Sequence, residues 1–140
     1  MNTNDAGCVL MVEDEEGFRR TFADFLEAEG YRVVRATDGE QGWRLARFIK
    51  PDLILLDIVL PKLSGYRVLK RIRADLTTNQ IPVVMCSVLD HQQEKEQALG
   101  LGANDYIVKG SNSPAEILEK IRATIHHPHH AGATTTGGVL

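Results

Sequence analysis

Asp52-Leu53-Ile54-Leu55-Leu56-Asp57, followed by Ile58-Val59-Leu60-Pro61, is the stretch that decides the fold. Four consecutive apolar residues lead into an acid, and a proline shortly after it stops any regular element. A strand without alternating apolar and polar residues is covered on both faces, which is typical of a parallel sheet in an α/β protein. Such sheets place their chemistry just beyond the carboxyl ends of their strands, so Asp57 is predicted to lie at a functional edge.

Five apolar runs predict strands, and each is followed by a stretch with helical periodicity. The predicted strands cover residues 8–12, 31–36, 53–57, 81–87 and 105–109. The predicted caps of the last four helices are Asp38, Ser64, Asp90 and Ser113. Because crossovers of this pattern are right-handed, all five strands are expected to be parallel. We therefore predict an α/β fold: a single doubly wound (βα)5 domain of flavodoxin-like topology, with helices on both faces of a five-stranded parallel sheet.

Two of the predicted helices have a largely polar surface. The fourth covers residues 91–99, with Asp90 and Gln93 as its capping pair and an apolar stripe of Ala98, Leu99 and Leu101. We expect such a thinly anchored helix to shift easily. The third helix carries a basic set that we place mostly on its solvent side, namely Arg67, Lys70, Arg71 and Arg73.

Length, charge and cysteine content exclude several classes of protein. With 140 residues and a net charge of −3, the chain has the size of one ordinary domain and no electrostatic feature that favours nucleic-acid binding. Its first residues lack the basic-then-apolar pattern of a signal peptide, so we expect none, and no apolar run approaches the roughly 18 residues that a membrane helix needs. Cys8 and Cys86 both lie in apolar, strand-like runs. We therefore expect two buried free thiols in a reducing cytoplasm and not a disulfide. We predict a cytoplasmic protein with one domain over residues 8–126, a flexible N-terminus over 1–7 and a disordered tail over 127–140.

Polar side chains stand at the ends of four predicted strands. Glu13 and Asp14 follow the first strand, Asp57 ends the third, Ser87 the fourth and Lys109 the fifth. In one parallel sheet these ends share an edge, so the side chains are predicted to converge. Three carboxylates about 4 Å apart would repel by roughly 4 kcal/mol per pair, so the pocket needs a raised pKa or a cation. A pocket lined only by oxygen atoms suits Mg²⁺. This ion is often held by one or two carboxylates and several waters, so a phosphoryl oxygen can also bind it.

Lys109 and Ser87 supply a positive charge and a hydroxyl, both suited to phosphate oxygens. A carboxylate beside a metal, a lysine and a hydroxyl is a nucleophile for phosphoryl transfer, and Asp57 would become an aspartyl phosphate. It needs no general base because a carboxylate is ionised at pH 7. Simpler interpretations stay open: Asp57 as a strand-terminal cap, Lys109 as a surface lysine, Ser87 as a turn hydroxyl and Tyr106 as a half-buried aromatic.

Residues from about Cys8 to Ile125 resemble a response-regulator receiver domain, the CheY-like phosphoacceptor of bacterial two-component signalling. The resemblance rests on five features in order: the acidic pair after the first strand, "LILLDIVLPKLSGY", the hydroxyl residue that ends the fourth strand, "GANDYIVK" and "SPAEILEKI". Each feature is weak alone. Their order and spacing together are specific.

The resemblance implies a role for each matching residue. The phosphorylated aspartate would be Asp57, and its Mg²⁺ would be bound directly by Asp14, through water by Glu13, and by the Val59 carbonyl. Ser87 and Lys109 would bind the phosphoryl oxygens, and Tyr106 would be the aromatic whose rotamer follows Ser87. The implied phosphodonor is a sensor histidine kinase or a phosphotransfer protein.

The resemblance also implies how the signal leaves the domain. Unless the chain is a fragment of a longer one, the lack of an output domain after Ile125 leads us to expect that a downstream protein binds the face formed by the fourth helix, fifth strand and fifth helix. We expect neither direct nucleic-acid contact nor membrane insertion. The chain would phosphorylate itself and slowly lose the phosphate, and would not be a turnover enzyme.

The sequence departs from the family pattern at three places. Gly110 stands where proline is usual after the lysine, and a non-proline cis bond costs about 2.5 to 4 kcal/mol, so a trans bond is expected. The segment "GSNSPAE" is one residue longer than usual, which affects the placement of Lys109. Glu13 replaces the commoner aspartate but still offers an acidic oxygen.

Three other functions compete with the signalling module. A metal-dependent phosphatase with an aspartyl nucleophile usually carries a second acid two residues later, where Val59 stands. An FMN-binding electron carrier has a phosphate loop rich in Ser, Thr and Gly, whereas residues 13–16 are all acidic. A receiver that binds partners without being phosphorylated is supported by Gly110.

Overall fold

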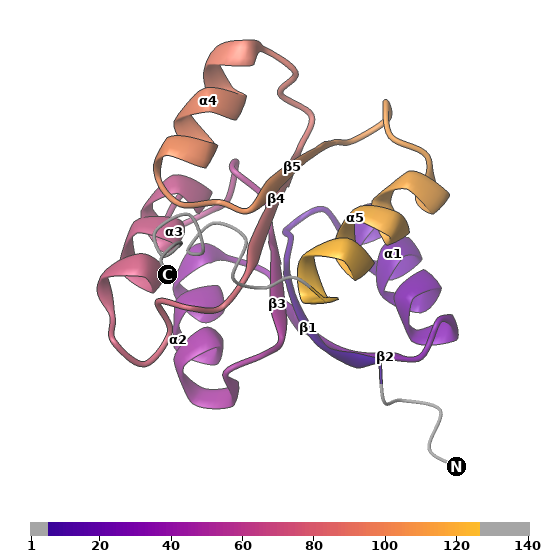
Figure 1. Cartoon of the computed structure of the whole chain (residues 1–140), viewed down its shortest axis with the longest axis horizontal. Helices are drawn as coiled ribbons and strands as arrows, with labels where there is room; N and C mark the ends of the chain where they lie inside the picture. Colours follow the sequence, from indigo (N-terminus) through magenta and orange to yellow (C-terminus); the bar gives the residue numbers. More distant parts are fainter. Residues whose placement is uncertain (1–5, 127–140) are drawn as a thin grey trace, which may run out of the picture.

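A computed structural model describes residues 6–126, in which five strands alternate with five helices (Figure 1). The strands are β1 (Gly7–Val12), β2 (Tyr31–Ala36), β3 (Leu53–Leu56), β4 (Val83–Ser87) and β5 (Asp105–Val108). The helices are α1 (Glu16–Ala28), α2 (Gly39–Ile49), α3 (Gly65–Ala74), α4 (Gln92–Gly100) and α5 (Pro114–His126).

The structure bears on the predicted flexible N-terminus at one residue, Gly7. Gly7, which we expected to be flexible, is the first residue of β1 and pairs with Tyr31 in the sheet. The predicted tail over residues 127–140 and most of the predicted flexible N-terminus lie outside the described residues.

All five strands form one parallel sheet in the order β2-β1-β3-β4-β5, which confirms the predicted flavodoxin-like topology. The last residue of β1, Val12, lies opposite Ala36 of β2 and Leu56 of β3. Ser87 at the end of β4 lies opposite Val108 of β5. This register brings the carboxyl ends of the central strands to one edge of the sheet.

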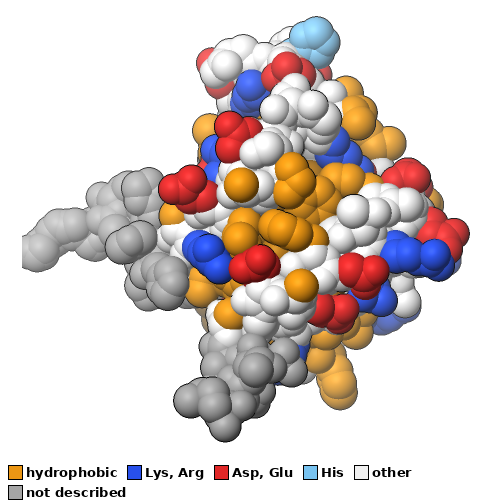
Figure 2. Space-filling model, turned by 90° about the vertical axis from the view of Figure 1, so that its right-hand side faces the viewer, with side chains coloured by type: hydrophobic (Ala, Val, Ile, Leu, Met, Phe, Trp, Pro, Cys, Tyr) orange, Lys and Arg blue, Asp and Glu red, His pale blue; other side chains and the backbone are white. Residues whose placement is uncertain are grey.

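Helices cover both faces of the sheet, with α1 and α5 on one face and α2, α3 and α4 on the other (Figure 1). Successive residues of a strand point to opposite faces, so the fully apolar β1 supplies both cores. Leu10 and Val12 pack with α2 and α3, whereas Val9 and Met11 pack with α1 and α5. Seen from the side of α1 and α5, hydrophobic side chains also reach the surface among charged ones (Figure 2).

Three predicted helix starts have the expected caps. The Arg67 N–H donates to Ser64 Oγ at 3.3 Å at the start of α3. The Gln41 amide N–H donates to Asp38 Oδ1 at 2.8 Å at the start of α2. At α5 the Glu116 N–H donates to Ser113 Oγ at 3.1 Å, and the Ser113 N–H donates to Glu116 Oε1 at 2.7 Å. The sequence thus identified these three starts correctly because capping is a local interaction.

The prediction for the start of α4 was wrong. The helix begins one residue later than expected, His91 is its N-cap, and His91 makes no side-chain capping hydrogen bond. Asp90 instead pairs with Lys95, with its Oδ1 at 3.0 Å from the Lys95 Nζ. Leu99, which we placed on the apolar stripe, is 49% exposed, and Ala98 is the one buried residue of α4. The helix is therefore held even more thinly than the sequence indicated.

Installing a cap on α4 is expected to stabilise the protein. The variant His91→Asp offers a carboxylate to the free N–H groups of the first turn, and should raise the free energy of unfolding by about 1 kcal/mol. Urea denaturation measures the change. His91→Ala is the matched control, because it alters the same exposed position without adding an acceptor, and equal stability of the two variants would contradict the prediction.

Arg73 is the member of the basic set of α3 that does not follow the expected solvent-side placement. Its guanidinium turns under the helix end and donates to the carbonyls of Ile81 at 2.7 Å and Gly102 at 3.0 Å, and to Asn104 Oδ1 at 3.0 Å. Burial lowers the pKa of Arg73 from its usual value. Helical periodicity gives the direction of Cβ, whereas the tip of a long side chain follows acceptors that are distant in sequence.

Three strands are shorter than predicted. Asp57 and Lys109 each lie one residue beyond the end of their strand, and β4 begins after Pro82. Cys8 and Cys86 are both buried and free, as expected. Among residues 6–126, the helices all fall short of the length and apolar character required to span a membrane.

Candidate functional site

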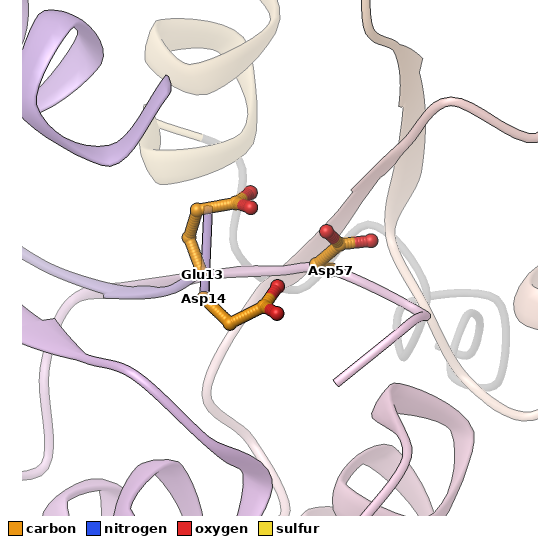
Figure 3. Close-up of side chains that lie close together, drawn as sticks. All are labelled: Glu13, Asp14 and Asp57. Atoms are coloured by element: carbon orange, nitrogen blue, oxygen red, sulfur yellow. The ribbon is translucent and has the colours of Figure 1, made fainter. Parts of the chain in front are cut away.

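The carboxyl edge of the sheet gathers three carboxylates. Glu13 and Asp14 directly follow β1 and Asp57 directly follows β3, so the side chains project from neighbouring strands (Figure 3). One carboxylate oxygen of each residue lies within 4.8 Å of the others. Glu13 and Asp57 are 2% and 6% exposed, whereas Asp14 is open to solvent. The predicted convergence of the acids is therefore present.

Lys109 joins the two buried carboxylates. Its Nζ lies 2.6 Å from Glu13 Oε1 and 2.9 Å from Asp57 Oδ2, and its side chain is 12% exposed. The backbone N–H of Lys109 donates to the Ser87 carbonyl at 2.8 Å, which continues the pairing of β5 with β4 by one residue. The Lys109–Gly110 peptide is trans, as expected, and Gly110 has a φ of +85°. The lysine thus reaches the pocket without a proline after it.

The second oxygens of these carboxylates bind backbone donors. Glu13 Oε2 accepts from the Glu15 N–H at 3.1 Å, and Asp57 Oδ1 accepts from the Val59 N–H at 3.2 Å. Glu13 therefore uses both oxygens within the protein. Both oxygens of Asp57 are likewise bound within the protein, so the exposed Asp14 carboxylate forms the solvent-facing side of the pocket.

Burial and charge act in opposite directions on the ionisable groups. Burial raises the pKa of Glu13 above its ordinary value of 4.5, and the nearby Lys109 ammonium opposes that rise. For Lys109, burial lowers the pKa, but the hydrogen bonds to Asp57 and Glu13 outweigh burial, so its pKa lies above the ordinary value. The lysine is therefore an ammonium at neutral pH, and a permanent positive charge faces Asp57.

Ser87 and Tyr106 are connected through the backbone of Leu89. Ser87 is fully buried at the end of β4, and its Oγ accepts from the Leu89 N–H at 3.3 Å. Tyr106, 7% exposed, donates its hydroxyl to the Leu89 carbonyl at 2.7 Å, and burial raises its pKa to about 12. The backbone of Leu89 thus links the two predicted switch residues, and no sequence pattern marks such a main-chain link.

The residues present fit a magnesium ion. The three acids supply carboxylate oxygens only, which is the ligand type that Mg²⁺ prefers, and Asp14 faces solvent, which suits an ion that keeps several waters. Asp14, the exposed carboxylate of the three, would be a direct ligand, whereas the oxygens of Glu13 and Asp57 also contact Lys109 and backbone N–H groups. Among residues 6–126 this is the one group of acids, histidines and cysteines arranged closely enough to hold a metal ion.

A parallel sheet in this order, with an acidic pocket and a lysine at its carboxyl edge, defines a CheY-like receiver fold. The chain belongs to the response regulator receiver domain family, whose family model matches residues 9–122. It is therefore a receiver domain of two-component signalling. This confirms the class of protein that the sequence motifs indicated.

Similar proteins come from several bacteria. The chain is 38% identical to the DNA-binding dual master transcriptional regulator RpaA of Synechocystis over 84% of this chain and 48% of that protein. It spans about half the length of the curated relatives it matches. A response regulator of Chloroflexus aurantiacus superimposes with a TM-score of 0.81 at 28% identity, covering 86% of this chain and 98% of that chain.

One solved neighbour contains a metal ion. The receiver domain of the Pseudomonas aeruginosa sensor histidine kinase PA1611 has a magnesium ion coordinated in its active site cleft. It is 32% identical, with a TM-score of 0.79 over 86% of this chain and 98% of that chain.

Proposed function

We propose that this domain accepts a phosphoryl group on Asp57 from a phosphohistidine of a sensor kinase or a phosphotransfer protein. The carboxylate oxygen forms the new O–P bond, the N–P bond of the donor breaks, and the released imidazole nitrogen takes up a proton. The observation that carries the proposal is the placement of Asp57, nearly buried at the end of β3, against the Lys109 ammonium at 2.9 Å and beside two further carboxylates.

Each neighbour of Asp57 has a chemical role in this proposal. Mg²⁺, held by Asp14, Asp57 and the Val59 carbonyl, and by Glu13 through water, would neutralise charge on the phosphoryl oxygens. Lys109 remains beside Asp57 as a fixed positive charge. Ser87 donates its hydroxyl to a phosphoryl oxygen once the Leu89 N–H releases it.

Transfer of the phosphoryl group would change the surface through the Leu89 link. Moving the Ser87 hydroxyl towards the phosphate breaks its contact with the Leu89 N–H, and the Leu89 carbonyl holds the Tyr106 hydroxyl. The loop before α4 and the side chain of Tyr106 then change together, and α4 follows because Ala98 is its one buried residue. We propose that a downstream protein reads this change on the α4–β5–α5 face, as a shift between two packings.

Contacts at Asp57 also weigh against the competing functions. The Lys109 ammonium contacts Asp57 although glycine, and not proline, follows the lysine. A receiver that is never phosphorylated would not need this contact. Val59 is 60% exposed and carries no acid, so a second acidic group for ester hydrolysis is missing at that position. We therefore propose a stoichiometric phosphoacceptor with slow loss of the phosphate, and not a turnover enzyme.

Incubation with acetyl phosphate and Mg²⁺ tests the function. Intact-mass spectrometry should show the addition of one phosphoryl group per chain, with none in Asp57→Asn and none when the metal is chelated. Asp105→Asn is the control, because it changes a half-exposed carboxylate at the first residue of β5 and should leave uptake intact. Unchanged uptake in Asp57→Asn, or continuous release of phosphate over many cycles, would refute the proposal.

A further inference from the structure

The position of Lys109 depends on its side-chain contacts. Gly110 has no side chain, lies in the left-handed region with a φ of +85°, and has no neighbours within 4 Å of where a Cβ would be. The turn is closed by the Ser111 and Asn112 N–H groups, which both donate to the Val108 carbonyl at 3.1 Å. The backbone is thus held by the turn, whereas the ammonium is placed by its own contacts with Glu13 at 2.6 Å and with Asp57 at 2.9 Å.

A third group completes the surroundings of this ammonium. The Lys109 Nζ lies 4.5 Å from the centroid of the Phe18 ring, over its face. The face of an aromatic ring is electron-rich and attracts a cation, most strongly where water is excluded. Because the Lys109 side chain is only 12% exposed, the ring takes the place of hydrating water on that side.

Phe18 is itself held in place by the fold. Its backbone N–H donates to Glu15 Oε1 at 2.6 Å in the cap of α1. Its ring packs against the ring of Phe22, with centroids 4.7 Å apart, and Phe22 is buried in the core beneath α1 and α5. The ring is therefore a preorganised surface, fixed before any phosphoryl group arrives.

We propose that Phe18 is a positioning residue that holds the Lys109 ammonium on Asp57 by a cation–π contact. The proposal rests on the proposed phosphoacceptor function for its effect on rate, but the contact itself can be measured separately. Two carboxylates draw the ammonium inwards, and the ring closes the side on which water would compete for it.

Two substitutions distinguish the electrostatic effect of the Phe18 ring from its contribution to packing. Phe18→Leu keeps an apolar side chain but removes the π face, whereas Phe18→Tyr keeps the face. We expect Phe18→Leu to take up phosphate from acetyl phosphate about threefold to tenfold more slowly, and Phe18→Tyr to stay within about twofold of the wild type. Thermal unfolding of each variant identifies any loss that comes from the folded fraction alone.

A double variant tests whether Phe18 acts through the lysine. In a Lys109→Met background the cation is absent, so adding Phe18→Leu should change the remaining rate less than twofold. An equal slowing in both backgrounds would overturn the proposal, because it would show that the ring serves only to pack the core.

Nuclear magnetic resonance tests the contact between Lys109 and the Phe18 ring directly, without phosphorylation of the protein. Protons on Cε of Lys109 should be shifted upfield by the ring current in the wild type and in Phe18→Tyr, and should return to ordinary values in Phe18→Leu. An unshifted wild-type resonance would overturn the proposal. If the wild type accepted no phosphoryl group, the proposed function would fail, while the ring-current shift would still show whether Phe18 holds Lys109.

Discussion

Replacing Gly65 by alanine is expected to lower the free energy of unfolding by more than about 3 kcal/mol. A Cβ at this position would lie 2.0 Å from the Asp57 carbonyl oxygen and 2.7 Å from Ile58 Cα. Both atoms belong to the backbone, so no flexible side chain can move aside. The Gly65 N–H also donates to the Ile58 carbonyl at 2.8 Å, which fixes the start of α3 against this loop.

The same substitution is expected to disturb the site, because the crowded carbonyl belongs to the proposed phosphoacceptor. Urea denaturation gives the stability, and phosphoryl uptake at low temperature gives the activity of the remaining folded protein. Gly100→Ala is the matched control: no atom lies within 4 Å of its Cβ position at the end of α4, and alanine there should gain up to about 1 kcal/mol. Equal stability of the two variants would show that the close approach at Gly65 is wrong.

Lys109→Met should lower the free energy of unfolding by about 3 kcal/mol at pH 7, since it leaves two nearly buried carboxylates without their cation. It should also reduce phosphoryl uptake strongly, because the fixed positive charge beside Asp57 is removed. Methionine has a similar length and keeps the apolar contacts of the side chain.

The stability loss of Lys109→Met should depend on pH through Glu13. Burial already raises the pKa of Glu13 above 4.5, and removal of the opposing ammonium raises it further. A carboxyl whose pKa is raised in the folded state favours folding below its unfolded-state pKa, and this contribution is lost as the pH rises through the folded-state pKa. The difference from the wild type should therefore be smallest near about pH 4 and largest at neutral pH.

Urea denaturation between about pH 4 and 7 checks this prediction. Lys120→Met is the control, because Lys120 pairs with Asp105 at 3.4 Å with both side chains about one third exposed. Such exposed pairs contribute roughly 0 to 1 kcal/mol. A deficit in Lys109→Met that stayed constant over the whole range would contradict a role for Glu13.

Local features of the fold could be predicted well. The apolar run before Asp57, the caps at Asp38 and Ser113 and the alternation of strands with helices all act over a few residues, and the structure contains each of them. The start of α4 was missed because Asp90 could either cap the helix or pair with Lys95, and the ion pair prevailed. Two local options of similar energy cannot be separated by pattern alone.

Some residues of the candidate site could likewise be selected from the sequence, and others could not. Glu13, Asp14, Asp57, Ser87 and Lys109 could be selected in advance, because each residue ends or follows a strand and a parallel sheet gathers such ends at one edge. Phe18 and Leu89 could not. Phe18 has the spacing of a core residue on an amphipathic helix, and Leu89 contributes main-chain atoms that every residue possesses.

The sequence by itself determined the strand and helix order, the edge at which the acids meet, and the residue types available for phosphoryl transfer, since periodicity, capping and strand ends are written in neighbouring residues. Only the tertiary structure decided which partner each charge takes. Lys109 lies 96 positions from Glu13 along the chain (109 minus 13), yet its Nζ is 2.6 Å from that carboxylate and lies over the Phe18 ring. Such contacts depend on the order of the strands in the sheet and on how α1 packs against it, which no local pattern encodes.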